Sequence, residues 1–373
     1  MLMRILQVIT SLETGGAEVL VVNLVPRFRA LGHEVDVCVF DGRRTPLMDR
    51  LEKENPGVRI YKLGHGYYNP FYILKLARIM RGYDIVHTHN SSPQLFVALS
   101  RVLCSVGLCT TEHNTSNRKR GWKWYAPIES WMYGRYDHII CISKIAEEKL
   151  REYMGGAWMS AGAPRYSKIS TINNGIDVRA LHDAECLPDE EAAHEGRFVC
   201  TMVAGFRDAK DQDTLVRALV HLPERFVVWL VGIGTRQDTV RRLAQELGVA
   251  SRVRFWGMRS DVPRILKSSD VVVMSSHFEG LSLSNIEGMS VGKPFVASDV
   301  NGLREVTKGW GLMFSEGDDT ELAGLLMRLA NDEDQYKKVA ASCFERAMQF
   351  DIAQMVQGYD TVYRQIVAIR NHG

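Results

Sequence analysis

Short apolar runs alternate with longer amphipathic stretches along the first half of the chain. The apolar runs are residues 5–9, 35–40, 85–86, 108–111, 139–142 and 169–172. Between the first two, residues 18–31 repeat apolar positions at helical spacing and stop at Gly32, a residue typical of helix ends. Short strands that alternate with helices predict a parallel sheet with helices on both faces.

A second series of apolar runs begins near residue 198. Its expected strands are residues 198–203, 226–231, 253–255, 271–274 and 294–297. The intervening segment, 177–196, is acidic and has no apolar period, so we interpret it as a linker. The pattern predicts an α/β protein with two doubly wound, Rossmann-like parallel-sheet domains, residues 1–176 and 197–351, that face a central cleft. A C-terminal helix at about 352–373 could pack back on the first domain.

The composition excludes several classes of protein. The chain has 373 residues, of which 46% are hydrophobic and 24% charged, so it is too apolar for a disordered protein and too long for one core. No apolar run approaches the ~20 residues of a membrane-spanning helix, and residues 3–9 lack the layout of a signal peptide. Seven scattered cysteines without a C-x-x-C pair indicate reduced thiols. These features predict a cytoplasmic protein.

Charge is divided unevenly between the two halves. The first 175 residues carry 23 Lys and Arg against 15 Asp and Glu, and the remainder carries 23 against 29. The difference fits either a different kind of partner for each half or a chance difference in charge between two solvated surfaces.

Three motifs resemble known binding sites and are interpreted otherwise. Residues 231–237 begin like a dinucleotide fingerprint but have no third glycine, and residues 288–294 resemble a P-loop but end in proline. Asp211 and Asp213 are spaced like metal ligands, yet they stand where a helix is expected to start. We interpret them as helix-capping residues.

Residues 275–294 form the most informative segment. An expected strand ends at residue 274, and a helix is expected to begin near Leu283, so its unpaired first-turn N–H groups could bind an anion. Glu279 precedes this helix and Glu287 lies about one turn into it. Carboxylates accept strong hydrogen bonds from sugar hydroxyls. Taken singly, either glutamate could instead be a cap or a solvated helical residue.

This segment resembles a family signature. Glu279 and Glu287, followed by Gly292-Lys293-Pro294, resemble the motif of retaining glycosyltransferases with the GT-B fold, glycosyltransferase family 4 (group 1). Weaker matches follow in the family's order along the chain: residues 14–18, 84–89, 141–144, 172–177, 231–234 and 253–257.

The resemblance implies transfer of a hexose-type sugar from a nucleotide-sugar donor, without a divalent metal or other cofactor. It places Glu287 at the ribose hydroxyls and Glu279 at the hexose hydroxyls. The residues it assigns to donor binding are Gly15, Gly16, Gly257, Met258, Arg259, Gly280, Leu281, Ser282, Leu283, Ser284 and Glu287. Lys210 and Arg207 are the cations expected at the diphosphate. The commonest family pattern has arginine where this chain has Gly205, and Arg207 resembles a variant of that pattern.

In the first domain the resemblance assigns His113 to the reacting centre. His89 and Asn90 are assigned to the acceptor side. His87 and His89 share a strand face and, with His113, could form a zinc trio, but no carboxylate or thiol has matching spacing. We therefore expect hydrogen-bonded histidines and no metal site.

Residues 117–125 mix cations with aromatic side chains. They could grip an anionic membrane surface, or form a basic loop whose tryptophans turn inward. The residues concerned are Arg118, Lys119, Arg120, Trp122, Lys123 and Trp124. Because no nucleic-acid module is recognisable, we expect no nucleic-acid partner.

The sequence thus predicts a retaining, metal-independent glycosyltransferase, with a UDP-sugar favoured over GDP-mannose as donor. Its acceptor would be a saccharide or lipid-linked saccharide in surface polysaccharide synthesis, and it could be peripheral at the inner face of the membrane. The alternatives are a nucleotide-sugar epimerase or phosphorylase of the same fold and a non-catalytic binding subunit.

Overall fold

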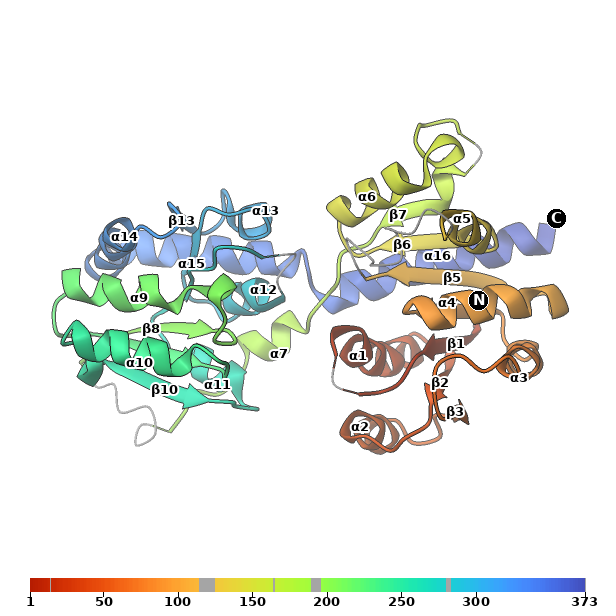
Figure 1. Ribbon diagram of the computed structural model, residues 1–373, viewed down its shortest axis with the longest axis horizontal. Coiled ribbons are helices and arrows are strands. Elements are labelled where there is room, and N and C mark those ends of the chain that lie inside the picture. Colours follow the sequence, from red (N-terminus) through yellow and green to blue (C-terminus); the bar gives the residue numbers. More distant parts are fainter. Residues whose placement is uncertain (14, 114–124, 164, 189–195, 280–282, 373) are drawn as a thin grey trace. The chain divides into compact units, whose positions relative to one another are not determined.

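The computed structural model describes residues 1–13, 15–113, 125–163, 165–188, 196–279 and 283–372 (Figure 1). The chain forms two compact units. The first comprises Met1–Asn174 with Ala353–Gly373, and the second comprises Gly175–Ile352. The chain thus leaves the first unit near residue 174 and returns to it near residue 353.

The first unit is built on a parallel sheet of seven described strands in the order β3-β2-β1-β4-β5-β6-β7. The strands are β1 (Arg4–Ile9), β2 (Glu34–Asp41), β3 (Ile60–Gly64), β4 (Ile85–His89), β5 (Gly107–Glu112), β6 (His138–Cys141) and β7 (Ile169–Thr171). Every residue of β4 and β5 is buried, because helices cover both faces of the sheet centre.

The helices of this unit are α1 (Gly16–Ala30), α2 (Pro46–Glu54), α3 (Tyr72–Met80), α4 (Ser91–Ser100), α5 (Ala126–Gly134), α6 (Lys144–Met154) and α16 (Ile352–His372), with short 3-10 turns such as η1 (Arg101–Leu103). Side-chain caps fix two of the starts: Thr45 accepts from the N–H of Met48, and Ser143 accepts from that of Ala146. Helix α16, violet in Figure 1, comes from the other end of the chain and packs on the first sheet through the buried Tyr359.

The second unit has a parallel sheet of six described strands in the order β10-β9-β8-β11-β12-β13. The strands are β8 (Phe198–Val203), β9 (Phe226–Val231), β10 (Val253–Gly257), β11 (Val271–Met274), β12 (Phe295–Ser298) and β13 (Leu312–Phe314). The helices are α7 (Val178–His182), α9 (Gln212–Ala218), α10 (Gln237–Glu246), α11 (Val262–Lys267), α12 (Leu283–Ser290), α13 (Leu303–Thr307), α14 (Asp319–Asn331) and α15 (Glu333–Met348).

The two parallel α/β sheets confirm the predicted fold class. The pattern missed β3 and β13, each of which buries a single apolar side chain, Leu63 and Phe314. It also gave 177–196 as a linker, whereas the structure places α7 there, with Val178 and Leu187 buried in the cores of the second unit. Two isolated apolar positions produce no periodic signal, so the packing of this segment could not be seen in the sequence.

Candidate active site

In the second unit, two loops leave the carboxyl ends of the neighbouring strands β8 and β11. Ser275 donates a hydrogen bond to the carbonyl of Asp211 over 2.6 Å, and the N–H of His277 donates to the carbonyl of Ala209 over 2.9 Å. Asp211, in the left-handed conformation, also caps helix α9, which confirms it as a helix-capping residue. These bonds hold the two loops together at the edge of the sheet where ligands of such folds bind.

The paired loops bring Lys210 next to Glu279. The ammonium of Lys210 forms an ion pair with Oε1 of Glu279, and Ser276 donates to the same oxygen over 2.7 Å. Glu279 is only 9% exposed, so a cation and a hydroxyl stabilise a carboxylate that burial would otherwise destabilise. The sequence proposed both charged residues but gave no sign of Ser276.

Glu287 contrasts with Glu279. It lies partly buried on α12, and burial raises its pKa. Within the described ranges its carboxylate has no hydrogen-bond or ion-pair partner. Helix α12 is held tightly, because a Cβ on Gly288 would lie 2.6 Å from the Phe295 ring. A carboxylate on a closely packed helix, with no partner among the described residues, can accept hydrogen bonds from ligand hydroxyls.

Arg207 is exposed at the same edge, and its Nε lies 3.9 Å from the point where a Cβ on Gly205 would be. The side chain of Arg207 thus runs beside Gly205, the position at which the commonest family pattern has arginine. The neighbouring glycines of the rejected dinucleotide motif serve loop packing: a Cβ on Gly232 would lie 2.2 Å from the carbonyl oxygen of Ala204. That contact explains the motif without a ligand.

The residues after β10 form a third part of this edge. Gly257 has a positive φ of 66°, and Met258 is 73% exposed. The guanidinium of Arg259 donates two hydrogen bonds of 2.7 Å to Asp261 and lies 5.1 Å from the centre of the Trp256 ring. Arg259 is therefore oriented by protein groups, and its contacts lower the pKa of Asp261 through the hydrogen bond.

In the first unit, a polar side chain inside β1 and polar side chains at the ends of β4 and β5 bond to one another. Nδ1 of His89 lies 3.0 Å from Nε2 of His113, and Nε2 of His89 lies 2.8 Å from Oε1 of Gln7. The amide of Gln7 donates to the Tyr363 hydroxyl of α16 over 3.3 Å. Burial lowers the pKa of His89 and lowers that of His113 to about 4, so both rings are neutral at neutral pH.

The network continues across α16. His87 bonds to the Tyr363 hydroxyl through Nδ1 and to Thr111 through Nε2, the latter over 2.7 Å, and Thr111 lies 3.2 Å from the Tyr359 hydroxyl. Burial lowers the pKa of His87 to about 3. All four side chains are fully buried. The histidines are therefore hydrogen-bonded, and no group of three or more potential metal ligands comes together in the described part of the chain.

Asn90 and Gly15 meet at Glu18. Asn90, with a positive φ of 71°, donates to Glu18 over 3.2 Å. A Cβ on Gly15 would lie 2.2 Å from the Glu18 carboxylate, so glycine leaves room for this side chain. Gly16 has open space around it. The carboxylate makes this loop better suited to a ligand hydroxyl than to a phosphate.

Two family descriptions match successive parts of the chain. Residues 14–180 match Glycosyltransferase Family 4, and residues 184–346 match Glycosyl transferases group 1. The chain belongs to glycosyltransferase family 4, group 1. The predicted family is confirmed, and the two α/β units are those of the GT-B fold.

Relatives of this glycosyltransferase match over most of their length. The N-acetyl-alpha-D-glucosaminyl L-malate synthase of Bacillus anthracis is 23% identical, with 97% of each chain covered. The UDP-Gal:alpha-D-GlcNAc-diphosphoundecaprenol alpha-1,3-galactosyltransferase of Escherichia coli is 25% identical, with 67% of each covered. The crystal structure of HepE from Anabaena in complex with UDP superposes with a TM-score of 0.79 at 20% identity, covering 97% of this chain and 100% of HepE.

Several predicted residues of the glycosyltransferase lie outside the described residues: Gly280, Leu281 and Ser282 of the donor loop, and Arg118, Lys119, Arg120, Trp122, Lys123 and Trp124 of the basic segment. Leu283 and Ser284 are the first residues of α12 and are half-buried. In the described ranges, no helix is both long and apolar enough to cross a membrane.

The sequence missed the residues that support the histidines. Gln7 is a polar residue inside a buried strand, and that anomaly was a usable signal. Tyr359 and Tyr363 are four residues apart and so share a helix face, but nothing in the sequence showed that this face meets β4.

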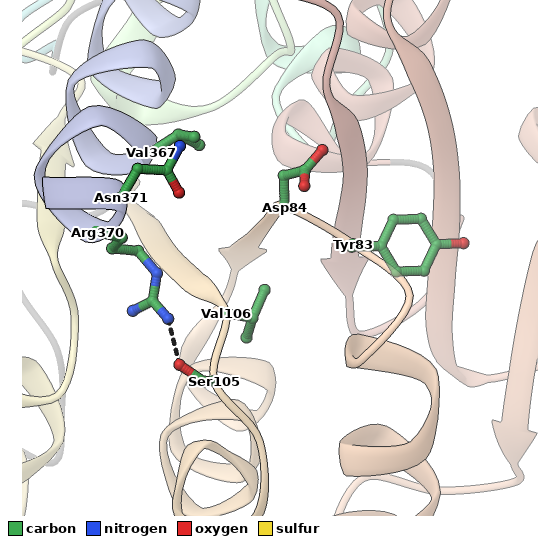
Figure 2. A pocket seen from close by; sticks show the side chains of 7 residues that line it. All are labelled: Tyr83, Asp84, Ser105, Val106, Val367, Arg370 and Asn371. Carbon is green, nitrogen blue, oxygen red and sulfur yellow. Dashed lines mark hydrogen bonds between the residues drawn. The ribbon is translucent and has the colours of Figure 1, made fainter.

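A cavity of about 200 Å³ lies at the opposite edge of the first sheet (Figure 2). Its lining includes Asp84 and Ser105, which precede strands β4 and β5, and Arg370 of α16, which donates to Ser105 over 2.5 Å. Ligands of parallel α/β sheets bind at the carboxyl ends of the strands. This cavity, at the amino ends, is therefore separate from the candidate site.

Proposed function

We propose that this glycosyltransferase moves a hexose-type sugar from a nucleoside diphosphate sugar to a hydroxyl of a saccharide or lipid-linked saccharide, with retention at the anomeric carbon. The observation that carries the proposal is the ion pair of Lys210 and Glu279 between the loops that leave β8 and β11, with Glu287 on α12, the helix that follows β11. A UDP-sugar is the favoured donor, with GDP-mannose second. UDP in the HepE structure and UDP-Gal in the E. coli enzyme's name support that order.

The charges of the second unit suit a diphosphate leaving group. Lys210 neutralises Glu279 in the ligand-free chain. A bound diphosphate would compete for this ammonium, and the released Glu279 oxygen would accept hydrogen bonds from the sugar. Arg207 would add a second cation, and Glu287 would accept from the ribose hydroxyls. Preorganised cations stabilise the charge that develops as the leaving group departs. On this proposal no metal is needed.

The first unit would hold the acceptor. His113 lies at the end of β5, and His89 with Asn90 at the end of β4. The acceptor oxygen would bond to the anomeric carbon on the face from which the diphosphate leaves. Its proton would pass to the leaving phosphate oxygen. That order retains the configuration and needs no covalent intermediate on the enzyme.

The biological setting is also a proposal. The E. coli relative acts on a diphosphoundecaprenol-linked sugar by its name. We place this chain in surface polysaccharide synthesis, in the cytoplasm or at the inner face of the cell membrane.

A thermal-shift screen tests the donor. Purified protein is melted with UDP, GDP, ADP or CMP, each with and without a chelator. A nucleotide that binds the folded state raises the melting temperature by mass action. A shift with UDP that the chelator leaves unchanged supports the proposal, and a shift with GDP alone moves the donor to GDP-mannose. No shift at millimolar concentration contradicts nucleotide-sugar binding and favours a binding subunit.

The stereochemistry needs its own measurement. With a UDP-sugar and an acceptor that gives turnover, the anomeric configuration of the first product formed is read by proton NMR. Retention supports the proposed mechanism, and inversion contradicts it.

A further inference from the structure

The loop after β8 that carries Lys210 is rich in carboxylates, although a diphosphate is expected to bind there. We call residues 207–213 the cation loop. It contains two cations and three carboxylates, which are Arg207, Lys210, Asp208, Asp211 and Asp213. The ammonium of Lys210 is already paired with Glu279. Like charges repel within the ~10 Å of a Debye length at moderate salt, so uncompensated carboxylates in this loop would oppose a bound diphosphate.

One of the three carboxylates finds its partners close by. Asp211 caps α9 and accepts from both the N–H and the hydroxyl of Thr214, the latter over 2.5 Å. Its Oδ2 also lies 3.6 Å from Nε2 of His277 on the loop after β11. Asp211 is therefore accounted for by its own helix start and by the neighbouring loop.

A single arginine pairs with the other two carboxylates. Nη1 of Arg236 donates to Oδ1 of Asp208 over 2.6 Å, and Nη2 donates to Oδ2 of Asp213 over 2.5 Å. The guanidinium is a rigid fork of donors, so each of its arms can take a different carboxylate. Oδ1 of the partly buried Asp213 accepts no hydrogen bond from the described residues. Among those residues, Arg236 is the cation that neutralises both carboxylates.

The backbone that carries Arg236 is fixed against the start of the cation loop. The N–H of Arg236 donates to the carbonyl of Phe206 over 3.2 Å, and the N–H of Phe206 donates to the carbonyl of Ile233 over 3.1 Å. A Cβ on Gly234 would lie 2.3 Å from the Phe206 carbonyl oxygen, so glycine is required for this close approach. The segment at 231–237, which begins like a dinucleotide fingerprint, therefore holds an arginine beside the cation loop.

We propose that Arg236 is a positioning residue that makes the cation loop able to accept a diphosphate, by neutralising Asp208 and Asp213. The inference rests on the proposed function, because its ligand is the diphosphate of the donor. Arg236 acts through the two carboxylates, since both arms of its guanidinium are occupied by them. Without Arg236, the carboxylates on either side of Lys210 in the chain would repel the diphosphate and compete with it for the ammonium.

Calorimetric titration with UDP at two salt concentrations tests this role. Arg236→Gln should weaken UDP binding about tenfold at ~50 mM salt and only about two- to threefold at ~500 mM, because salt screens the freed carboxylates. A role in loop packing alone would give a loss that salt does not reduce. In transfer assays, Arg236→Gln should raise the KM for the donor and leave the KM for the acceptor unchanged.

Arg225→Gln is the matched control. Arg225 precedes β9, at the opposite edge of the sheet from Arg236, and donates to the neutral side chain of Asn331 over 2.7 Å. The substitution removes one positive charge from the second unit, as Arg236→Gln does, but leaves no carboxylate without its cation. This variant should bind UDP as wild type does.

Removal of the two carboxylates should rescue the loss. In Arg236→Gln/Asp208→Asn/Asp213→Asn no charge remains for Arg236 to neutralise, so the affinity for UDP should return to within about twofold of wild type. Asp208→Asn/Asp213→Asn alone should bind UDP at least as tightly as wild type. The triple variant also keeps the test decisive if Arg236→Gln folds poorly, because it contains none of the three charges.

Two results overturn the inference. One is Arg236→Gln that binds UDP as tightly as wild type at low salt. The other is a triple variant that binds as weakly as Arg236→Gln, since Arg236 would then contact the donor itself. Wild-type protein that binds neither UDP nor GDP is a different result, because it contradicts the proposed function and removes this inference with it.

Discussion

The polar side chains near the strand ends differ in charge between the two units. In the first unit His87, His89 and His113 are uncharged and bond to one another, to hydroxyls and to an amide. In the second unit the polar side chains are carboxylates and cations, and Glu287 has no described partner. Neutral groups can be buried when their hydrogen bonds are satisfied, whereas unpaired charges remain costly until a ligand pairs with them. The second unit is therefore the one built for an ionic ligand.

Removal of the Lys210 ammonium should have the largest effect. Lys210→Ala and Glu279→Ala are each expected to lower kcat/KM by about 10²–10³-fold, as loss of one preorganised charge contact does. Steady-state transfer assays, with the donor class that the thermal-shift screen selects, measure this. Lys337→Ala, which breaks an exposed pair of 2.6 Å with Glu333 on α15, is the control and should be near wild type. Full activity in both site variants would refute an ionic role for the pair.

The position of Arg207 beside Gly205 makes a rescue experiment possible. Arg207→Ala should lower kcat/KM by about 10–100-fold, the worth of one charge-assisted hydrogen bond. A Cβ on Gly205 would have only ordinary contacts, the nearest at 3.5 Å to the Ile233 carbonyl, so arginine is sterically possible there. Gly205→Arg combined with Arg207→Ala should restore most of the lost activity. If Arg207→Ala alone is fully active, the guanidinium does not reach the donor.

Much of the fold could be predicted from the sequence, but the site residues of the two units could be predicted to different extents. Buried parallel strands such as β8 give continuous apolar runs, and the run at 198–203 matches the strand in both bounds. The charged pair of the second unit was proposed through the resemblance to the family, because Lys210 and Glu279 taken singly look like a solvated loop residue and a helix cap. The support of His113 was not found, because Gln7 and Tyr363 meet only through a packing of α16 that no local pattern encodes.

The neutral network of the first unit should make the protein sensitive to acid. Burial lowers the pKa of His113 to about 4 and that of His87 to about 3, below the unfolded value of 6.5. Above pH 6.5 both states are neutral and these groups give no pH dependence. As the pH falls from 6.5 toward 4, the unfolded chain binds protons that the folded chain does not, so the free energy of unfolding falls.

Melting temperatures between pH 7.5 and 5 measure this loss. His113→Gln should have a shallower decline than wild type, because one of the titrating groups is gone. A matched test is His138→Asn, since burial also lowers the pKa of His138 to about 4, outside the network. Its decline should be shallower by a similar amount. A melting temperature that is constant over this range would show that the histidines are not held neutral.

Glu287 offers the smallest effect and the opposite sign. Burial raises its folded pKa above the ordinary value of 4.5, so the folded state disfavours its charge. The stability that this shift provides is present below pH 4.5 and is lost as the pH rises through the folded pKa. At neutral pH the buried charge therefore costs stability, and Glu287→Gln should raise the melting temperature by about 1–3 °C. The gain should shrink as the pH is lowered toward 5.

The same substitution should weaken the ligand. A carboxamide oxygen accepts a weaker hydrogen bond than a carboxylate, so the thermal shift that UDP produces should become smaller in Glu287→Gln. Glu333→Gln on α15 is the control. The hydrogen bond from Lys337 lowers the pKa of Glu333, so this substitution should not raise the melting temperature, and it should leave the thermal shift with UDP unchanged. A more stable protein that binds UDP less well would identify Glu287 as a charge kept for the ligand. An unchanged thermal shift with UDP in Glu287→Gln would show that the carboxylate of Glu287 does not contact the ligand.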